Sequence, residues 1–291
     1  DYEVIVVDDG SDSPLRLDQL QLDTSNPNAV RIINLAKQPR GRGPGYARNV
    51  GVWASSGRYC AFLDDDDSWS KRDHLAAVQH AIDNAAATID LYLANQEAYH
   101  QDGTIERLWL YRAVAMLERA NRVPSNGVYQ TTATELLAAG SFCHLNTTIV
   151  RRELFDLIGG LDEYLAYEED LDFYLRAIDQ ASHIVLSPDV VARHNVPDRS
   201  KKNSASTSLS QLNKLNIRLY LLNKNMLSAR HQSVADFCRQ YCLSTTKHIA
   251  EHYTGEKNYA MAYQFATRAL GVRVSLKWLV YCVYLRILAW G

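Results

Sequence analysis

Four consecutive aspartates, Asp64 to Asp67, follow a short apolar run and are the side chains best suited to chemistry in this sequence. Adjacent carboxylates repel one another, so such a cluster is unfavourable unless water solvates it or a cation neutralises it. Carboxylate oxygens suit hard divalent ions such as Mg²⁺ or Mn²⁺. An EF-hand is disfavoured because the sixth position of such a loop, here Trp69, would have to be glycine. The alternative is a solvated acidic turn.

A second acidic pair, Asp8 and Asp9, follows the apolar run at residues 4–7 and precedes Gly10. Asp-Gly after a strand is ordinary turn chemistry. Open α/β sheets, however, bind ligands at the carboxyl ends of their strands. Two acidic strand ends in one sheet would meet at the same edge, and we therefore expect a ligand site there.

Glycines and arginines alternate in the loop that precedes a predicted helix at residues 46–55. Gly41, Gly43 and Gly45 do not fit the G-x-G-x-x-G pattern, and the chain has no G-x-x-x-x-G-K-[ST] element. Rossmann dinucleotide and P-loop sites are therefore disfavoured. Backbone amides and guanidinium groups here, including that of Arg48, could still approach a phosphate. The alternative is a flexible loop with solvated arginines.

Two further candidates lie later in the chain. Glu168, Glu169 and Asp170 open a predicted helix at residues 168–180, where acidic residues are favourable through the helix dipole alone. A carboxylate at hydrogen-bonding distance from a hydroxyl could instead act as a general base, and Asp170 is the candidate. His194 could be a metal ligand or a phosphate contact, although a lone histidine is more often structural or solvated.

The elements that must position these residues alternate along the first two thirds of the chain. This alternation is typical of an open parallel sheet with helices on both faces. Residues 95–140 show little periodicity, and only helices are predicted from about residue 209 onward. We expect strands at 4–7, 30–35, 58–63, 89–94, 145–150 and 183–186, the last ending at Pro188, and helices near 46–55, 73–87, 151–158 and 168–180.

Composition excludes several classes of protein. With 47% hydrophobic and 22% charged residues the chain is globular rather than disordered. A net charge of −2 provides no overall field toward nucleic acid, which we exclude as a partner. The five cysteines form no C-x-x-C pair, which disfavours a zinc ribbon or a disulfide framework and favours a reducing compartment. We therefore expect a cytoplasmic protein, and the inner face of a membrane is compatible with that location.

The last twenty residues, 272–291, are apolar and aromatic, and their only charges are Arg273, Lys277 and Arg286. The uncharged run from Trp278 to Leu285 is too short to span a bilayer, which needs about 20 apolar residues. One interpretation is a core helix that packs onto the catalytic domain. The other is peripheral membrane contact, with the helix in the headgroup region. Both stay open on the sequence.

Taken together, these segments resemble family 2 glycosyltransferases of the GT-A fold. Order and spacing agree over residues 1–200. The resemblance implies a GT-A domain over residues 1–205, built on an open mixed sheet flanked by helices, and a helical C-terminal region over 206–291. Family members begin with a further strand-helix unit, so we expect this domain to be N-terminally incomplete. The matching segments are Val6–Ser11, Gly45–Gly51, Gly57–Trp69, Gly159–Glu163 and Glu168–Asp172.

The resemblance implies a binding site for a nucleotide-sugar donor, with a UDP-sugar expected. Asp9 resembles the aspartate that contacts the nucleotide base. Asp64 is similar to the first aspartate of the family's D-x-D motif, near the ribose. Arg48 lies in the A-R-N segment that contacts the nucleotide or its diphosphate. Asp65 and Glu169 complete the expected substrate-binding set.

The resemblance also implies the chemistry. Asp66 resembles the metal-binding aspartate of the D-x-D motif, His194 is similar to a further metal ligand after the last strand, and Asp170 matches the catalytic base. The implied reaction transfers a sugar to the hydroxyl of a glycan or lipid-linked acceptor, in surface polysaccharide or glycan synthesis. Mn²⁺ or Mg²⁺ would neutralise charge on the leaving diphosphate, and a single displacement would invert the anomeric configuration.

Two other functions compete with this one. The first is a catalytically silent nucleotide-sugar-binding or scaffold protein, which would bind UDP without turning over a donor. The second is a nucleotidyltransferase, which shares acidic metal-binding strand ends. A nucleotidyltransferase is disfavoured because the N-terminal part of this sequence has no Gly-rich loop that carries a lysine.

Overall fold

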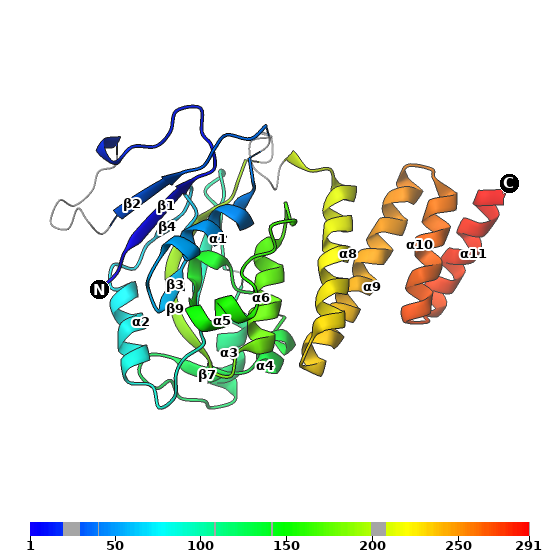
Figure 1. Ribbon diagram of the computed structural model, residues 1–291. Coiled ribbons are helices and arrows are strands. Elements are labelled where there is room, and N and C mark those ends of the chain that lie inside the picture. Colours follow the sequence, from blue (N-terminus) through cyan, green and yellow to red (C-terminus); the bar gives the residue numbers. More distant parts are fainter. Residues whose placement is uncertain (20–29, 40, 108, 141, 199–207, 291) are drawn as a thin grey trace. The chain divides into compact units, whose positions relative to one another are not determined.

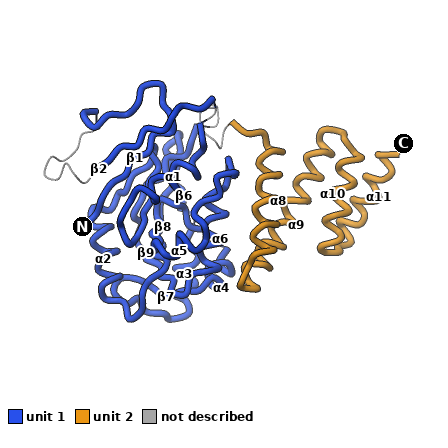
Figure 2. Tube along the Cα trace, viewed as in Figure 1, with its two compact units in different colours: residues 1–198 blue, residues 199–291 orange. Residues whose placement is uncertain are grey.

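The computed structural model describes residues 1–19, 30–39, 41–107, 109–140, 142–198 and 208–290. The chain divides into two compact units, residues 1–198 and residues 199–291 (Figure 2). All the described strands lie in the first unit, and the second is helical. No helix in the described residues is both long enough and apolar enough to cross a membrane.

The first unit is built on a seven-stranded mixed sheet (Figure 1). Its strand order is β3-β8-β5-β9-β4, with β6 paired to β5 and β7 to β9. Only the β5–β9 pair is parallel, and the other pairs are antiparallel. The strands are β3 Tyr59–Ala61, β4 Ser68–Trp69, β5 Leu91–Tyr99, β6 Ile105–Glu106, β7 Tyr129–Thr131, β8 Thr148–Arg151 and β9 Ile184–Asn195.

The first two strands form a small sheet of their own. β1 (Val4–Asp8) pairs in parallel with β2 (Val30–Asn34), and this pair is separate from the seven-stranded sheet. The expectation of one sheet with a buried first strand is therefore wrong for the described residues. β1 is only half-buried, because it has a single strand neighbour and covers one face against α1 (Pro44–Ala54), where Val7 packs near Gly51.

Helices cover the seven-stranded sheet and make up the second unit. The core of the first unit is built from β5 residues such as Leu91 and Leu93 and from the inward face of α6 (Glu169–Gln180), including Leu175 and Ile178, which are all fully buried. This face has the spacing expected of a helix that packs on a sheet. The remaining helices are α2 His74–Asp83, α3 Tyr111–Arg119, α4 Ala133–Ala138, α5 Arg152–Leu157, α6 Glu169–Gln180, α8 Gln211–Ser228, α9 Gln232–Gly255, α10 Tyr259–Val272 and α11 Leu276–Trp290.

Two expectations about strands need correction. β9 continues through Pro188 to Asn195 instead of ending at the proline. The β5–β9 register shifts between Leu93 and Asn95, and such an irregularity accommodates a residue that cannot donate to the ladder. The sheet is mixed, which confirms what the family resemblance implies. It is mostly antiparallel rather than parallel as the alternation of elements predicts, because that alternation indicates the type of each element but not its direction. This extension of β9 is what carries His194 to the site.

Candidate active site

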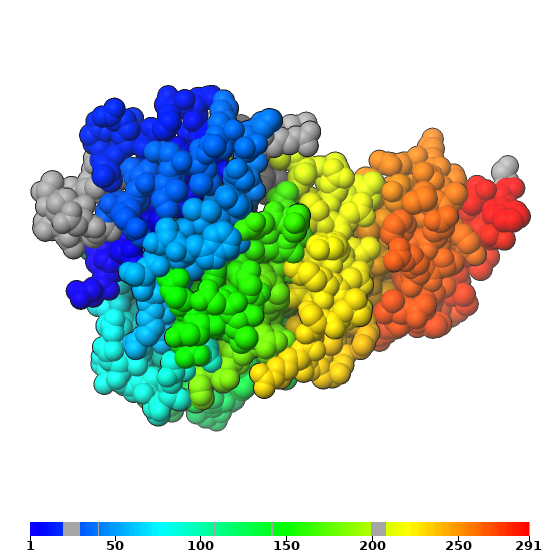
Figure 3. Space-filling model, viewed as in Figure 1, coloured from blue at the N-terminus to red at the C-terminus, as the bar shows by residue number. Residues whose placement is uncertain are grey.

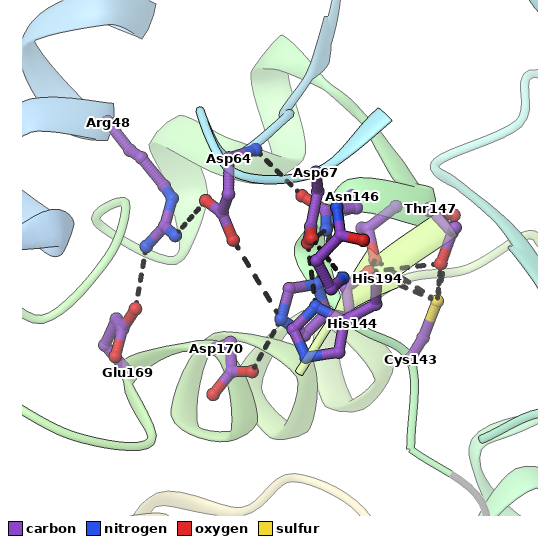
Figure 4. A network of polar contacts seen from close by, with 12 residues as sticks. Arg48, Asp64, Asp67, Cys143, His144, Asn146, Thr147, Glu169, Asp170 and His194 are labelled. Carbon is purple, nitrogen blue, oxygen red and sulfur yellow. Dashed lines mark hydrogen bonds and ion pairs between the residues drawn. The ribbon is translucent and has the colours of Figure 1, made fainter. Parts of the chain in front are cut away.

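One guanidinium links three elements at the carboxyl end of β3. Arg48, on α1, donates from Nη2 to Asp64 Oδ1 at 2.5 Å and from Nη1 to Glu169 Oε1 at 2.7 Å (Figure 4). Burial alone would lower the pKa of Arg48, but the charges of the two carboxylates outweigh this effect and hold the pKa above its ordinary value. The arginine is therefore permanently charged, and its planar fork joins α1 to the turn after β3 and to the start of α6.

Asp170 lies in the first turn of α6, directly beside this bridge. The preceding Glu168 has φ +58, a left-handed conformation that is strained for a residue with a side chain and turns the chain into the helix. Asp170 Oδ1 accepts a hydrogen bond from the Leu171 amide at 2.8 Å, and Oδ2 lies 3.8 Å from His144 Nε2. Burial raises the pKa of Asp170 to about 6, which suits a group that accepts a proton near neutral pH.

Asp67 is the structural member of the acidic cluster. Its side chain is fully buried, and it accepts hydrogen bonds from the Asn195 amide at 2.7 Å and from the Asn146 carboxamide. Its Oδ2 lies 2.8 Å from His194 Nδ1. Burial alone would raise the pKa of Asp67, but these partners hold it below its ordinary value. A carboxylate bound to Nδ1 orients the ring and leaves Nε2 as the atom for a further partner, as at many metal sites.

The chemistry of the remaining donors fits a divalent cation. Asp66 is exposed beside three other carboxylates, and partial burial followed by the charges of Asp67 and Asp64 raises its pKa. A cation would relieve this repulsion. Burial lowers the pKa of His194, but the bond to Asp67 and the neighbouring carboxylates outweigh it and raise the pKa. Carboxylate oxygen and imidazole nitrogen are ligands that Mn²⁺ accepts.

A geometric alternative for the cation is the group Asp64, Asp67 and His144, whose ligand atoms lie within 4.8 Å of one another. This group is less suitable for two reasons. Asp67 already accepts several hydrogen bonds, and His144 Nδ1 accepts from the Asn146 amide at 3.4 Å. That bond places the ring proton on Nε2, the atom that faces the carboxylates. Asp66 and His194 therefore stay the predicted ligands.

Asp9 closes the glycine loop before α1. Its Oδ2 accepts from the amides of Arg42 at 2.7 Å and Gly43 at 2.9 Å. Gly41 has φ +66, and a Cβ there would lie 2.7 Å from Asp9 Oδ2, so this position requires glycine. The structure thus joins Asp9 to the glycine loop, whereas Arg48, Asp64, Glu169 and Asp170 meet at the ionic bridge. Contact of Asp9 with a nucleotide base stays a prediction, as does a binding role for Asp65, which is exposed.

Three residues at the site were not expected from the sequence. Asn146 is buried, bonds Asp67, and accepts from the Asp64 amide at 2.9 Å. His144 lies between Asp64 and Asp170, and its ring is 5.1 Å from that of His194. Trp109 has the left-handed φ of +58 and packs edge-on against His194 at 5.9 Å. Asn146 lies in a 3₁₀ turn, residues 145–147, where the pattern predicts a strand, and for that reason its side chain gave no signal in the sequence.

Comparison with known proteins identifies the family of the chain. Residues 1–158 match the model of the family described as glycosyl transferase family 2. The chain is 27% identical over 191 residues to the succinoglycan biosynthesis protein ExoW of Rhizobium meliloti, covering 64% of this chain and 57% of that protein. It is 26% identical over 195 residues to the glycosyltransferase AglE of Haloferax volcanii, covering 66% and 56%. The aligned part of this chain is thus little more than half the length of either relative.

Solved structures show the same fold. S. aureus TarS residues 1–349 in complex with UDP-GlcNAc superimposes with a TM-score of 0.59 at 18% identity, covering 98% of this chain and 70% of that chain. The complex of the same protein with UDP gives a TM-score of 0.60, also at 18% identity, covering 99% and 78%. The likeness confirms the GT-A architecture with a C-terminal helical region. Because the family model matches more than half of the sequence, the chain belongs to glycosyl transferase family 2.

Proposed function

We propose that the protein is a metal-dependent, inverting glycosyltransferase that moves a sugar from a UDP-sugar to the hydroxyl of a glycan or lipid-linked acceptor. The observation that carries the proposal is the largely buried carboxyl of Asp170, one fifth exposed and with a pKa of about 6, beside the bridge from Arg48 to Asp64 and Glu169. Displacement of an anionic diphosphate by a hydroxyl requires two groups: a base whose pKa lies near neutral pH, which accepts the proton, and a fixed cation beside it.

In the proposed reaction the acceptor oxygen attacks the anomeric carbon as Asp170 takes its proton. The new carbon–oxygen bond forms while the bond to the diphosphate breaks, and a single displacement inverts the anomeric centre. We expect the Arg48 guanidinium, which projects from the helix that follows the glycine loop, to face the departing diphosphate. Asp66 and His194 would hold Mn²⁺ or Mg²⁺, which supplies neutralisation of the charge on the diphosphate.

Several features support the finer parts of the proposal. UDP-GlcNAc and UDP are bound in the TarS structures, which favours a UDP-sugar. The description of ExoW as a succinoglycan biosynthesis protein favours a role in polysaccharide synthesis. The five cysteines are all free and buried thiols, which favours a cytoplasmic location that includes the inner membrane face. We place the catalytic domain in residues 1–205 and the helical region in 206–291.

A panel of UDP- and GDP-sugars, assayed for nucleotide release with Mn²⁺ and again in excess EDTA, tests the proposal. We expect release from one or a few UDP-sugars, dependent on the metal and increased by acceptor glycans. A protein that binds UDP in titration calorimetry yet releases nucleotide from no donor is the silent binder considered above. Full activity in excess EDTA would refute metal dependence while leaving the transferase proposal intact.

A further inference from the structure

Helix α11 is apolar on two opposite sides. Trp278, Cys282 and Leu285 are buried against the preceding helices, and Trp278 Nε1 donates to the Ala266 carbonyl of α10 at 2.8 Å. The other side, which we term the outer face, is uncovered in the described residues. Its members are Leu276, Val280, Val283, Ile287 and Trp290, which are between 56% and 77% exposed.

The outer face is a continuous row rather than a set of scattered residues. Its members are spaced four, three, four and three residues apart, so at about 100° per residue they lie on one side of the helix, opposite the buried side. Soluble proteins rarely leave such a row of large apolar side chains in water unless it binds something. Figure 3 shows α11 at the surface of the helical unit, in red.

Positive charge borders this row on both sides. With about 100° of rotation per residue, Lys277 and Arg286 lie on opposite flanks of the outer face. The Arg286 guanidinium lies over the Trp290 ring, 3.9 Å from its centroid. Arg273 is exposed just before the helix. Residues 257–291 contain no aspartate or glutamate, although the whole chain carries −2. Their cations are Lys257, Arg268, Arg273, Lys277 and Arg286.

We propose that the outer face of α11 docks onto the surface of an anionic lipid bilayer, with the helix lying in the plane of the headgroups. The apolar row would enter the boundary between headgroups and acyl chains, and Lys277 and Arg286 would stay at the level of the anionic headgroups. The buried side of the same helix packs within the protein, so α11 serves as both a core helix and a contact helix. The proposal does not depend on the glycosyl transfer reaction.

A second copy of the chain is a poorer occupant. The spacing of the outer face would also suit a helix pair, but the flanks of two α11 helices would then bring lysine and arginine next to lysine and arginine. No carboxylate in residues 257–291 could offset that repulsion. An anionic bilayer offers charge of the opposite sign and an apolar layer together.

Vesicle flotation of the full chain tests the proposal, with vesicles of phosphatidylcholine alone or mixed with phosphatidylglycerol. The test variant combines Val280→Gln, Val283→Gln and Ile287→Gln. The matched control combines Val123→Gln, Leu157→Gln and Leu227→Gln, which replaces side chains that are at least as exposed but lie outside α11. All six positions are on the surface, and thermal melting should show that both variants stay folded.

We expect the parent and the control to float with the mixed vesicles only, and the test variant to stay in the lower fraction. A second variant, Arg273→Gln with Lys277→Gln, should bind about fivefold more weakly for each charge removed, and the parent should detach as salt rises. Equal flotation of parent and test variant would overturn the proposal. So would an absence of binding by the parent, or self-association in sedimentation that the test variant abolishes without any binding to vesicles.

Discussion

Replacing Asp170 by asparagine should separate catalysis from stability, because the two effects have opposite signs. The Asp170 carboxyl has a pKa of about 6 in the fold against an ordinary value of 3.8, so its ionisation at neutral pH disfavours the folded state by about 3 kcal/mol. One fifth of the side chain is exposed, and solvent screening reduces this figure to about 1–2 kcal/mol. Asp170→Asn removes the charge but keeps an oxygen that can accept the Leu171 amide.

The expected sign follows from proton binding. Between about pH 4 and pH 6 folded Asp170 holds its proton more tightly than the unfolded chain does, so its contribution to stability is present at low pH and is lost as the pH rises through 6. The variant lacks this dependence. The difference in free energy of unfolding, variant minus parent, should therefore be near zero at about pH 4 and reach about 1–2 kcal/mol at neutral pH.

Three assays check this prediction. Urea unfolding across the pH range gives the stability difference, and nucleotide release with the best donor gives turnover, which should fall by about 10² to 10⁴ because an amide cannot accept the proton. Nucleotide binding, measured by UDP titration, should change little. If Asp170→Asn turned over like the parent while Glu169→Gln did not, the base would be the neighbouring residue. A variant less stable than the parent at neutral pH would refute the electrostatic argument.

Three further predictions follow from the site and the fold. The catalytic efficiency, kcat/KM, should fall as the pH drops below about 6, because Asp170 becomes protonated. A kcat/KM that stays constant down to about pH 4.5 would contradict the assignment of Asp170 as the base. Asp66→Ala should weaken Mn²⁺ binding in calorimetry and abolish nucleotide release. An unchanged Mn²⁺ affinity would show that other carboxylates bind the metal. Gly160→Ala should lower stability by more than about 2 kcal/mol, since φ is +68 and the new Cβ would lie 2.7 Å from Asn49 Oδ1. Gly159→Ala, at φ +77 with open space around it, should cost about 1 kcal/mol, and equal melting temperatures for the two variants would remove the steric argument.

The elements of the fold were largely predictable, but their pairing was not. Apolar runs and helical spacing located β1, β2, α1 and α6 to within a few residues, because side-chain periodicity follows directly from burial. The same periodicity carries no information on strand direction or on which strands are neighbours. The separate β1–β2 pair and the passage of β9 through Pro188 were accordingly missed. The antiparallel pairs could not be read from periodicity, although the mixed sheet implied by the family resemblance is confirmed. Residues 95–140 escaped because short elements such as β7 and α4 show too few repeats to detect.

The candidate site shows the same division. Residue type and position at a strand end or helix start pointed to the acidic runs that hold Asp64 and Asp170, but Arg48, Asp64 and Glu169 were singled out through the family resemblance; the structure brings these four together. Asn146 and similar partners could not be selected, because a buried asparagine in a short turn leaves no periodic or charge pattern in the sequence.

The four aspartates show why chemistry cannot be assigned by residue type alone. Asp67 is a hydrogen-bonded anchor for His194, Asp64 is held by Arg48, and Asp66 is exposed with a raised pKa. These differences arise from which way each successive side chain leaves the turn after β3, and from the β9 and 145–147 segments that arrive from far along the chain. A carboxylate already satisfied by hydrogen bonds has little to gain from a cation, whereas a crowded one has much. The raised pKa of Asp66 therefore agrees with our proposal that this aspartate holds the metal ion, which Asp66→Ala tests.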